Sequence, residues 1–283
     1  MGAEQSGTFE IGGDIEVRRM GFGAMRITGD NIIGPPEDEE EARRVLRRAV
    51  DLGVDFIDTA DSYGPGVSER LIREELHPYE ADGRDVTVAT KGCLMRRPDG
   101  QWIRNGDPNY LKNATLCSVD RLGVETIDLY QLHRFDEDVP NEDSLNALAE
   151  MKDEGYIEHI GLSEVTVEEL EEARDTVEVA TVQNRYNVGD REHDDVLDYC
   201  EDNGIGFMPW FPLASGNLAA KDEELQEVAE THDATQYQVA LAWLLERSPV
   251  MLPIPGTGSV EHLEENVAAA ELELTDDDME LLG

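Results

Sequence analysis

The chain has 283 residues, of which 64 are acidic and 23 are basic, so its formal net charge is −41. This charge repels phosphates and anionic lipid surfaces, which argues against nucleic acids and membranes as partners. Apolar residues make up 40% of the chain, enough for the core of one large domain or two small ones.

The N-terminal part of the chain predicts a β-hairpin, followed by the first strand and helix of a repeating pattern. The hairpin pairs residues 8–11 with residues 15–18 around a Gly-Gly turn. A strand over 20–25 then precedes an amphipathic helix over 38–52. The helix starts with acidic residues and is followed by Gly53, in agreement with the helix dipole and with the preference for glycine after a helix.

Further strands and helices alternate along the rest of the chain. Strands are expected at residues 54–58, 86–91, 126–132, 157–162, 179–183, 206–210 and 251–254. Helices are expected at residues 67–75, 109–122, 141–154, 167–175, 194–203, 225–231 with 237–246, and 260–269. Units of about 35 residues predict an α/β fold, a single (β/α)8 TIM barrel that forms one domain over 1–283. A doubly wound sheet is the alternative, but the glycine fingerprint of its dinucleotide site is incomplete.

Cysteine and histidine spacing predicts no metal site. Cys93, Cys117 and Cys200 show no C-x-x-C pattern and are expected to be reduced thiols. The six His residues lack H-x-H or H-E-x-x-H spacing. The first residues lack signal-peptide features, and the longest apolar run, 239–245, is too short to cross a bilayer. We therefore expect a cytoplasmic protein, and the acidic excess with few Lys predicts the high ionic strength of a halophilic host.

Polar residues gather at the predicted strand ends, where barrel enzymes carry their active sites. Lys91 closes one strand, and Asp58, which closes the neighbouring strand, can supply the carboxylate that a buried ammonium requires. Tyr63 follows Asp58 closely, so the ammonium is expected to lower its pKa and make it a proton donor. His133 can orient a carbonyl oxygen. Taken singly, these residues are better explained as caps, packing or a structural ion pair, but together they predict a site that protonates a carbonyl.

A carbonyl that accepts a proton also needs a hydride, so a cofactor is expected. Gly256, Thr257 and Ser259 lie in a turn directly before a predicted helix, where backbone N–H groups can bind phosphate. Trp210 offers a flat face on which a nicotinamide can stack, although a Trp that fills the core has the same spacing. The segments 26–36 and 92–109, the second of which contains Trp102, are expected to border the substrate pocket.

The sequence resembles the aldo-keto reductase family over nearly its whole length. Residues 56–64 resemble the family's Asp-Thr-Ala-x-x-Tyr-Gly segment, residues 88–91 its lysine strand and residues 128–133 its histidine strand. The resemblance implies reversible, NAD(P)H-dependent reduction of an aldehyde or ketone to an alcohol. It makes Tyr63 the general acid, tuned by Lys91 and Asp58, and it makes His133 the residue that positions the oxygen.

The resemblance also implies where the nicotinamide cofactor binds. The residues assigned to the cofactor are Ser163, Gln183, Trp210, Phe211, Pro212, Leu213, Gly256, Thr257, Ser259, His262, Glu265 and Asn266. The Lys and Arg with which the family commonly grips the 2′-phosphate of NADP fall on Gly256 and His262, so NADP(H) is favoured only slightly and NAD(H) stays open. Glu164 replaces the usual Asn, and an ionised carboxylate cannot donate to the carbonyl of the carboxamide.

Two functions of different classes follow from this pattern. The first is a reductase of a small-molecule carbonyl substrate. The alternative is a nucleotide-sensing, non-catalytic regulatory subunit that binds NADP(H) and a protein partner, as some relatives in the family do. The preserved proton-donor set favours the reductase, because sensing a nucleotide requires no acid.

Overall fold

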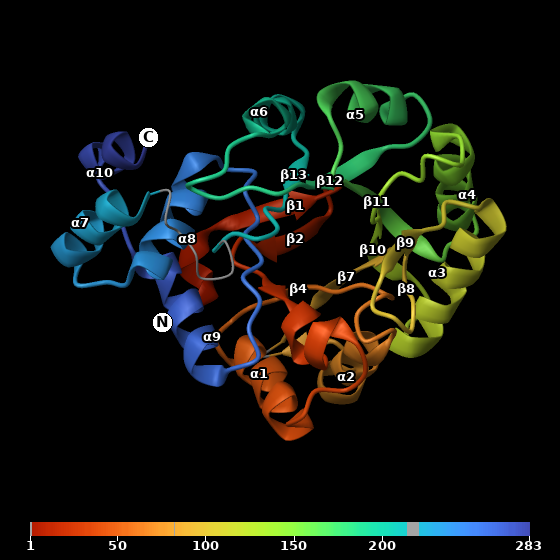
Figure 1. Ribbon diagram of the computed structural model, residues 1–283, viewed down its shortest axis with the longest axis horizontal. Helices are drawn as coiled ribbons and strands as arrows, with labels where there is room; N and C mark the ends of the chain where they lie inside the picture. The colour runs from red at the N-terminus through yellow and green to blue at the C-terminus, as the bar shows by residue number, and fades with distance from the viewer. Residues whose placement is uncertain (1, 82, 214–220) are drawn as a thin grey trace.

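Parallel strands form the centre of the molecule, and helices surround them (Figure 1). The structure, a computed structural model, describes residues 2–81, 83–213 and 221–283. The central sheet has seven strands in the order β13-β12-β11-β10-β7-β4-β3. Their bounds are β3 (Phe22–Gly23), β4 (Phe56–Asp58), β7 (Thr87–Gly92), β10 (Ile127–Leu132), β11 (Ile157–Ser163), β12 (Val179–Gln183) and β13 (Gly206–Phe207).

The predicted eighth strand, residues 251–254, closes the ring between the two edges of this sheet. On one side, the N–H of Leu252 donates to the carbonyl of Phe207 at 2.8 Å. On the other side, the N–H of Gly21 donates to the carbonyl of Pro253 at 3.0 Å. Because Pro253 has no N–H to donate, the segment forms an isolated bridge instead of a regular strand. The fold is therefore the predicted (β/α)8 barrel.

The predicted helices begin and end within a few residues of their expected bounds, whereas α10 (Asp276–Leu282), near the C-terminus, was not predicted. Asp38 caps the first of them by accepting a hydrogen bond from the N–H of Glu41, and Gly53, just after it, has a positive φ of 86°. No helix of the described residues is long and apolar enough to cross a bilayer. The helices are α1 (Glu39–Asp51), α2 (Val67–Leu76), α3 (Pro108–Leu122), α4 (Asn141–Asp153), α5 (Val167–Arg174), α6 (Asp194–Asn203), α7 (Asp222–His232), α8 (Gln236–Arg247), α9 (Val260–Ala268) and α10 (Asp276–Leu282).

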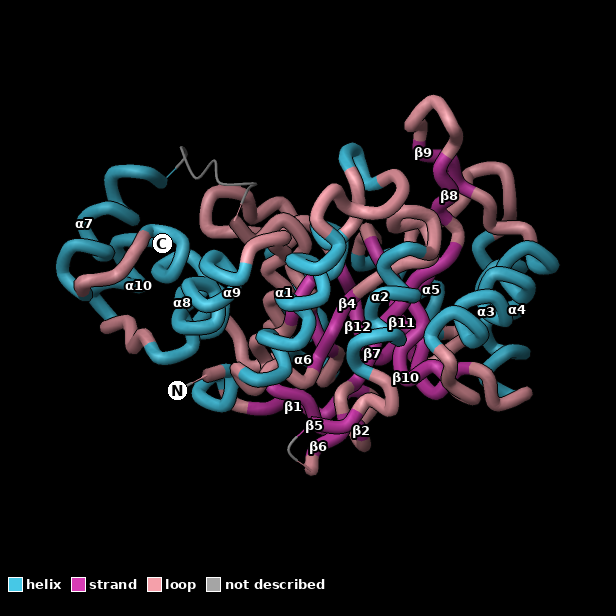
Figure 2. Tube along the Cα trace, turned by 90° about the horizontal axis from the view of Figure 1, so that it is seen from below, coloured by secondary structure: helices cyan, strands magenta, loops and turns pink. Residues whose placement is uncertain are grey.

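Two hairpins lie at opposite ends of the barrel (Figure 2). The predicted one, β1 (Thr8–Ile11) with β2 (Ile15–Arg18), packs Ile11 and Val17 into an apolar cluster inside one end. The other, β8 (Leu94–Arg96) with β9 (Trp102–Arg104), projects from the opposite end and was not predicted. A short third pair, β5 (Glu80–Ala81) with β6 (Arg84–Asp85), was not predicted either.

Two predicted strands end earlier in the structure because their chains leave the sheet at the cavity end. The strand expected at 20–25 gives way to a 3-10 helix, Ala24–Ile27, directly after β3. The strand expected at 206–210 ends with β13, and Trp210 keeps only an isolated bridge to Arg185. Among the described residues, further 3-10 helices span Ala3–Ser6, Asp30–Ile32 and Ala269–Glu271.

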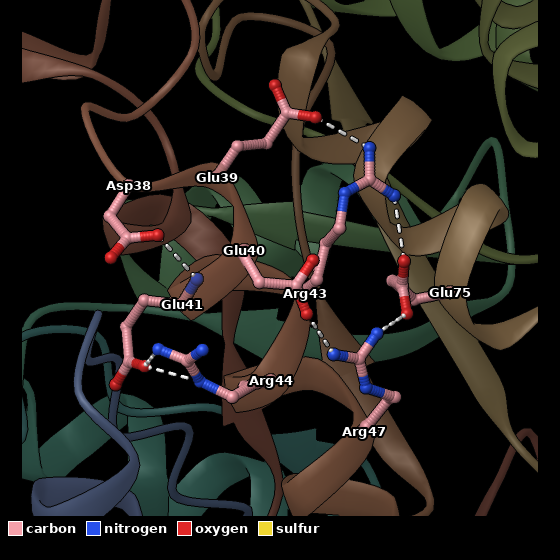
Figure 3. A network of polar contacts seen from close by, with 8 residues as sticks. All are labelled: Asp38, Glu39, Glu40, Glu41, Arg43, Arg44, Arg47 and Glu75. Atoms are coloured by element: carbon pink, nitrogen blue, oxygen red, sulfur yellow. Dashed lines mark hydrogen bonds and ion pairs between the residues drawn. The ribbon is translucent and has the colours of Figure 1, made fainter.

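Ion pairs connect the outer faces of α1 and α2 (Figure 3). Arg43 donates to Glu39 at 2.6 Å and to Glu75 at 2.7 Å. Arg47 donates to Glu40 at 2.7 Å and also to Glu75. Arg43 and Glu75 are partly buried, whereas Glu39 and Glu40 are exposed. Ion pairs at the surface stabilise a protein by about 0–1 kcal/mol each, so the network joins the helices without dominating stability.

Candidate active site

The centre of the site is an ion pair between neighbouring strands. Asp58 ends β4 and Lys91 lies near the end of β7, the adjacent strand of the sheet. The Nζ of Lys91 lies 2.6 Å from Oδ2 of Asp58 and donates to the carbonyl of Thr59 at 2.8 Å. Burial lowers the pKa of Lys91, but Asp58 and Tyr63 outweigh it, and that pKa lies above its ordinary value. The lysine is therefore a buried cation.

Two glutamines hold the other carboxylate oxygen of Asp58. Oδ1 accepts a hydrogen bond from Nε2 of Gln131 at 2.9 Å and from Nε2 of Gln183 at 3.0 Å. Gln131 lies on β10 and was not predicted as part of the site, although it stands two residues before His133 in the histidine strand. Gln183, which was expected to hold the cofactor, therefore also fixes the carboxylate that pairs with Lys91.

Tyr63 lies in the turn between β4 and α2, beside this ion pair. Its ring centroid is 5.3 Å from Nζ of Lys91 and 6.0 Å from the imidazole of His133, in an edge-on arrangement. Burial raises the pKa of Tyr63 above its ordinary value, although the Lys91 cation lowers it in part. The prediction that the ammonium lowers this pKa is therefore wrong in its net direction, because desolvation of the phenolate is the larger effect.

His133 lies just beyond the end of β10. Burial, together with the cations of Lys91 and Arg134, holds the pKa of His133 well below its ordinary range, so the ring is neutral. Its Nδ1 is buried and finds no hydrogen-bond partner among the residues that the structure describes. A buried polar atom of this kind is a candidate ligand contact.

A cavity of about 600 Å³ opens in front of these side chains. Asp58, Tyr63 and His133 line it, whereas Lys91 is fully buried and is not among its lining residues. The expected cofactor residues that line it are Ser163, Gln183, Gly256 and the run 210–213. Both expected border segments contribute, the first through Arg26 and Ile32 and the second through Leu94, Trp102 and Arg104.

Other expected cofactor residues lie beside the cavity, at the start of α9. Ser259 caps this helix by accepting a hydrogen bond from the N–H of His262 at 3.5 Å, and Thr257 accepts one from the N–H of Ser259 at 3.1 Å. His262 is exposed. Glu265 and Asn266 follow within the same helix and do not line the cavity. The structure thus divides the predicted cofactor residues into a group in the cavity and a group on α9.

Gly256 lines the cavity and directly precedes Thr257, so it lies between the two groups in the chain. Its backbone packs closely against that of Gly23. A Cβ added there would lie 2.6 Å from the carbonyl oxygen of Gly23. This distance is too short for a side chain, so the lysine that the family commonly places here does not fit in this backbone arrangement.

Two charged residues at or next to the cavity wall were missed or left without a role. Arg134, which the sequence did not single out, lines the cavity and donates through Nη1 to the carbonyl of His133 at 2.7 Å and to Oγ of Ser163 at 2.8 Å. Glu164 accepts hydrogen bonds from the N–H of Arg185 at 2.8 Å and from Nε1 of Trp210. The carboxylate is therefore engaged with the loops that follow β12 and β13.

Comparison with known proteins identifies the family. A sequence model of the Aldo/keto reductase family matches residues 19–282. The chain belongs to the aldo/keto reductase family. It is 51% identical over 273 residues to an uncharacterised oxidoreductase of Schizosaccharomyces pombe, covering 96% of this chain and 88% of that protein. It is 42% identical over 278 residues to pyridoxine 4-dehydrogenase of Escherichia coli, covering 96% of each chain.

Solved structures of other aldo/keto reductases have the same fold. The thermostable aldo-keto reductase Tm1743, in complex with an inhibitor, is 32% identical with a TM-score of 0.85, over 97% of this chain and 98% of that one. An aldo-keto reductase of Klebsiella pneumoniae in complex with NADPH is 25% identical with a TM-score of 0.80, over 97% of this chain and 93% of that one. This aldo/keto reductase is therefore an oxidoreductase that acts on a carbonyl/alcohol couple.

Proposed function

We propose that this aldo/keto reductase reduces an aldehyde or ketone to an alcohol, reversibly and with NAD(P)H, and that Tyr63 is its general acid. The observation that carries the proposal is the convergence of Tyr63, Lys91, Asp58 and His133 at one end of a cavity. A bound reduced nicotinamide would supply the hydride to the carbonyl carbon. The chain's own residues would bind and orient the carbonyl and provide the proton.

The phenol of Tyr63 donates its proton to the carbonyl oxygen as the alcohol forms. The raised pKa of Tyr63 keeps the phenol protonated before the reaction. The cation of Lys91 then stabilises the phenolate that remains, and Asp58 keeps this lysine charged. The neutral ring of His133 can donate an N–H to the same carbonyl oxygen and hold it beside Tyr63.

A nicotinamide cofactor fits the residues of the cavity and its border. Ser163, Gln183 and Trp210 line the same cavity as Tyr63, and Gly256, which also lines it, stands just before the start of α9. We favour NADP(H) slightly, and the Klebsiella reductase with its NADPH supports this choice. Because Gly256 has no room for a lysine, we expect discrimination against NAD(H) to be weak.

The relatives and the cavity lining suggest the first substrates to test. The Escherichia coli relative is named for the oxidation of pyridoxine, and we place the corresponding aldehyde first in the panel. The side chains of Leu94, Trp102 and Phe211 give the cavity an apolar and aromatic wall that suits a ring-bearing carbonyl compound.

Turnover with purified protein tests the proposed function. The assay follows oxidation of NADPH, and separately of NADH, in high salt with pyridoxal and a panel of simple aldehydes and ketones. We expect cofactor oxidation that depends on the carbonyl compound, with NADPH preferred by a small factor. Tight binding of NADP(H) without turnover on any member of the panel would contradict the proposal and favour the nucleotide-sensing subunit.

A further inference from the structure

Glu164 occupies a position where three loops of the cavity wall meet. It follows β11, and its N–H donates to the carbonyl of Gln183 at the end of β12, at 3.0 Å. Its Oε1 accepts from the N–H of Arg185, beyond β12, at 2.8 Å and from the indole Nε1 of Trp210, beyond β13. One carboxylate oxygen therefore joins the segments that follow three consecutive strands.

The backbone at Glu164 is unusual for a glutamate. Its φ of 57° lies in the left-handed region, where asparagine is better tolerated than glutamate. A residue held in this conformation at a cavity wall costs stability, and such strain is typically found where the surrounding contacts depend on it. The contacts here are those of its side chain with Arg185 and Trp210.

The side chain of Trp210 has one polar group, the indole N–H, and this group donates to Glu164. An indole N–H can only donate, and a carboxylate is the stronger kind of acceptor for it. The backbone of Trp210 is fixed separately, because its N–H donates to the carbonyl of Asn184 at 3.0 Å. The ring is half-buried and lines the cavity, so its plane depends on the side-chain contact with Glu164 and on the edge of Phe211, whose ring centroid lies 5.6 Å away.

The other flank of this wall is held by a cation. Arg134 donates to Oγ of Ser163, the residue directly before Glu164, at 2.8 Å, and its charge interacts with the Glu164 carboxylate. Arg134 thus adds a positive charge close to Glu164, whose acceptor oxygen is directed to Trp210 and to the N–H of Arg185.

We propose that Glu164 is a positioning residue that fixes the indole plane of Trp210 and so shapes the face of the cavity that receives the nicotinamide. This inference rests on the proposed function for the identity of the ligand, but the orientation of the indole does not depend on any ligand. In this arrangement Glu164 accepts a hydrogen bond from Trp210, and it does not donate one to the carboxamide of the nicotinamide.

A double-mutant cycle tests the pairing. The variants are Glu164→Ala, Trp210→Phe and the two combined, with Glu164→Gln retaining an acceptor oxygen without the charge. Glu168→Ala is the matched control, since it removes one exposed carboxylate four residues further along the chain. Each protein is titrated with NADPH and NADP+ by calorimetry, and tryptophan emission and acrylamide quenching are recorded without cofactor.

We expect Glu164→Ala to weaken cofactor binding about tenfold, since a charge-assisted hydrogen bond is lost. The emission of Trp210, isolated by difference from Trp210→Phe, should shift to the red and quench more readily. Glu164→Gln should restore most of the binding, and Glu168→Ala should change neither property. In the Trp210→Phe background, Glu164→Ala should add little.

Two results would overturn the proposal. The first is an equal loss of binding on Glu164→Ala with and without Trp210, because the carboxylate would then act through the backbone of Arg185 alone. The second is unchanged Trp210 emission and quenching in Glu164→Ala. The fluorescence test needs no turnover and no cofactor, so its failure is distinguishable from a failure of the proposed reductase activity.

Discussion

Removal of either charge of the buried Asp58–Lys91 pair should destabilise the fold strongly, and removal of both should cost less than the sum. Lys91 is fully buried, and Asp58 is 3% exposed. Asp58→Asn removes the negative charge beside the ammonium, which keeps its hydrogen bond to the Thr59 carbonyl, and it places an amide N–H₂ among the N–H donors of Lys91, Gln131 and Gln183. Lys91→Met leaves the carboxylate with two neutral amide donors, those of Gln131 and Gln183.

The size of the effect follows from the burial of the pair. Breaking a buried ion pair by removing one partner costs about 3–5 kcal/mol, because the other charge is left uncompensated. With an unfolding entropy of about 2.1 cal/mol/K per residue over 283 residues, such a loss lowers Tm by about 5–8 °C. In the double variant neither charge is buried alone, so we expect a coupling of at least about 2 kcal/mol.

Urea unfolding at constant high salt measures the four proteins of this cycle. The free energies of unfolding should be strongly non-additive. The reasoning is refuted if each single variant unfolds within about 1 kcal/mol of the parent chain, or if the two losses simply add, because the pair would then not be a buried, mutually dependent unit.

Three further predictions concern pH, backbone packing and salt. Since burial raises the pKa of Tyr63, the rate of carbonyl reduction should stay constant through neutral pH and fall only above the ordinary tyrosine pKa of about 10. A fall in rate that begins near pH 7–8, in a protein that circular dichroism shows to be folded, would contradict this prediction. Gly256→Ala should cost about 1–3 kcal/mol of stability and weaken cofactor binding more than Gly258→Ala. A Cβ at Gly256 would lie 2.6 Å from the Gly23 carbonyl oxygen, whereas a Cβ at Gly258 would lie 3.1 Å from its nearest neighbour. Equal effects of the two variants in calorimetry would refute the steric argument. With a net charge of −41, Tm should rise steadily as NaCl increases from about 0.1 M, where the screening length is about 10 Å; a Tm independent of salt would contradict the expectation of a high-salt host.

The sequence predicted the barrel and the gathering of the four central residues for a topological reason. In a closed parallel sheet, Asp58 and Lys91 meet because adjacent strands end at the same edge. The same rule brought Tyr63 and His133 to the cavity. These placements depend only on where each strand ends, which hydrophobic periodicity indicates well.

Other features depend on contacts that the sequence pattern does not contain. The net direction of the Tyr63 pKa is decided by burial, which periodicity does not measure. The partner of Glu164 is Trp210, 46 residues further along the chain and on a different loop. Gln131 looked like one more residue of a buried strand, yet it holds the carboxylate of Asp58.

The β8–β9 hairpin was missed although the sequence carries a signal for it. Pro98-Asp99-Gly100 is typical of a turn, and apolar pairs flank it on both sides. Its strands of three residues are too short for an alternating pattern to be evident. The expectation that this segment borders the pocket was nevertheless confirmed, because loops after barrel strands surround the site.

The proton transfer from Tyr63 is tested most directly by the single-turnover rate of Tyr63→Phe with saturating NADPH and the best carbonyl substrate of the panel. The variant keeps the aromatic ring beside Lys91 and loses only the hydroxyl, so cofactor binding should be unchanged. We predict that the rate of hydride transfer falls by about 10²–10⁴-fold, the usual contribution of a positioned general acid. A rate equal to that of the parent protein, with equal cofactor affinity, would show that another group supplies the proton.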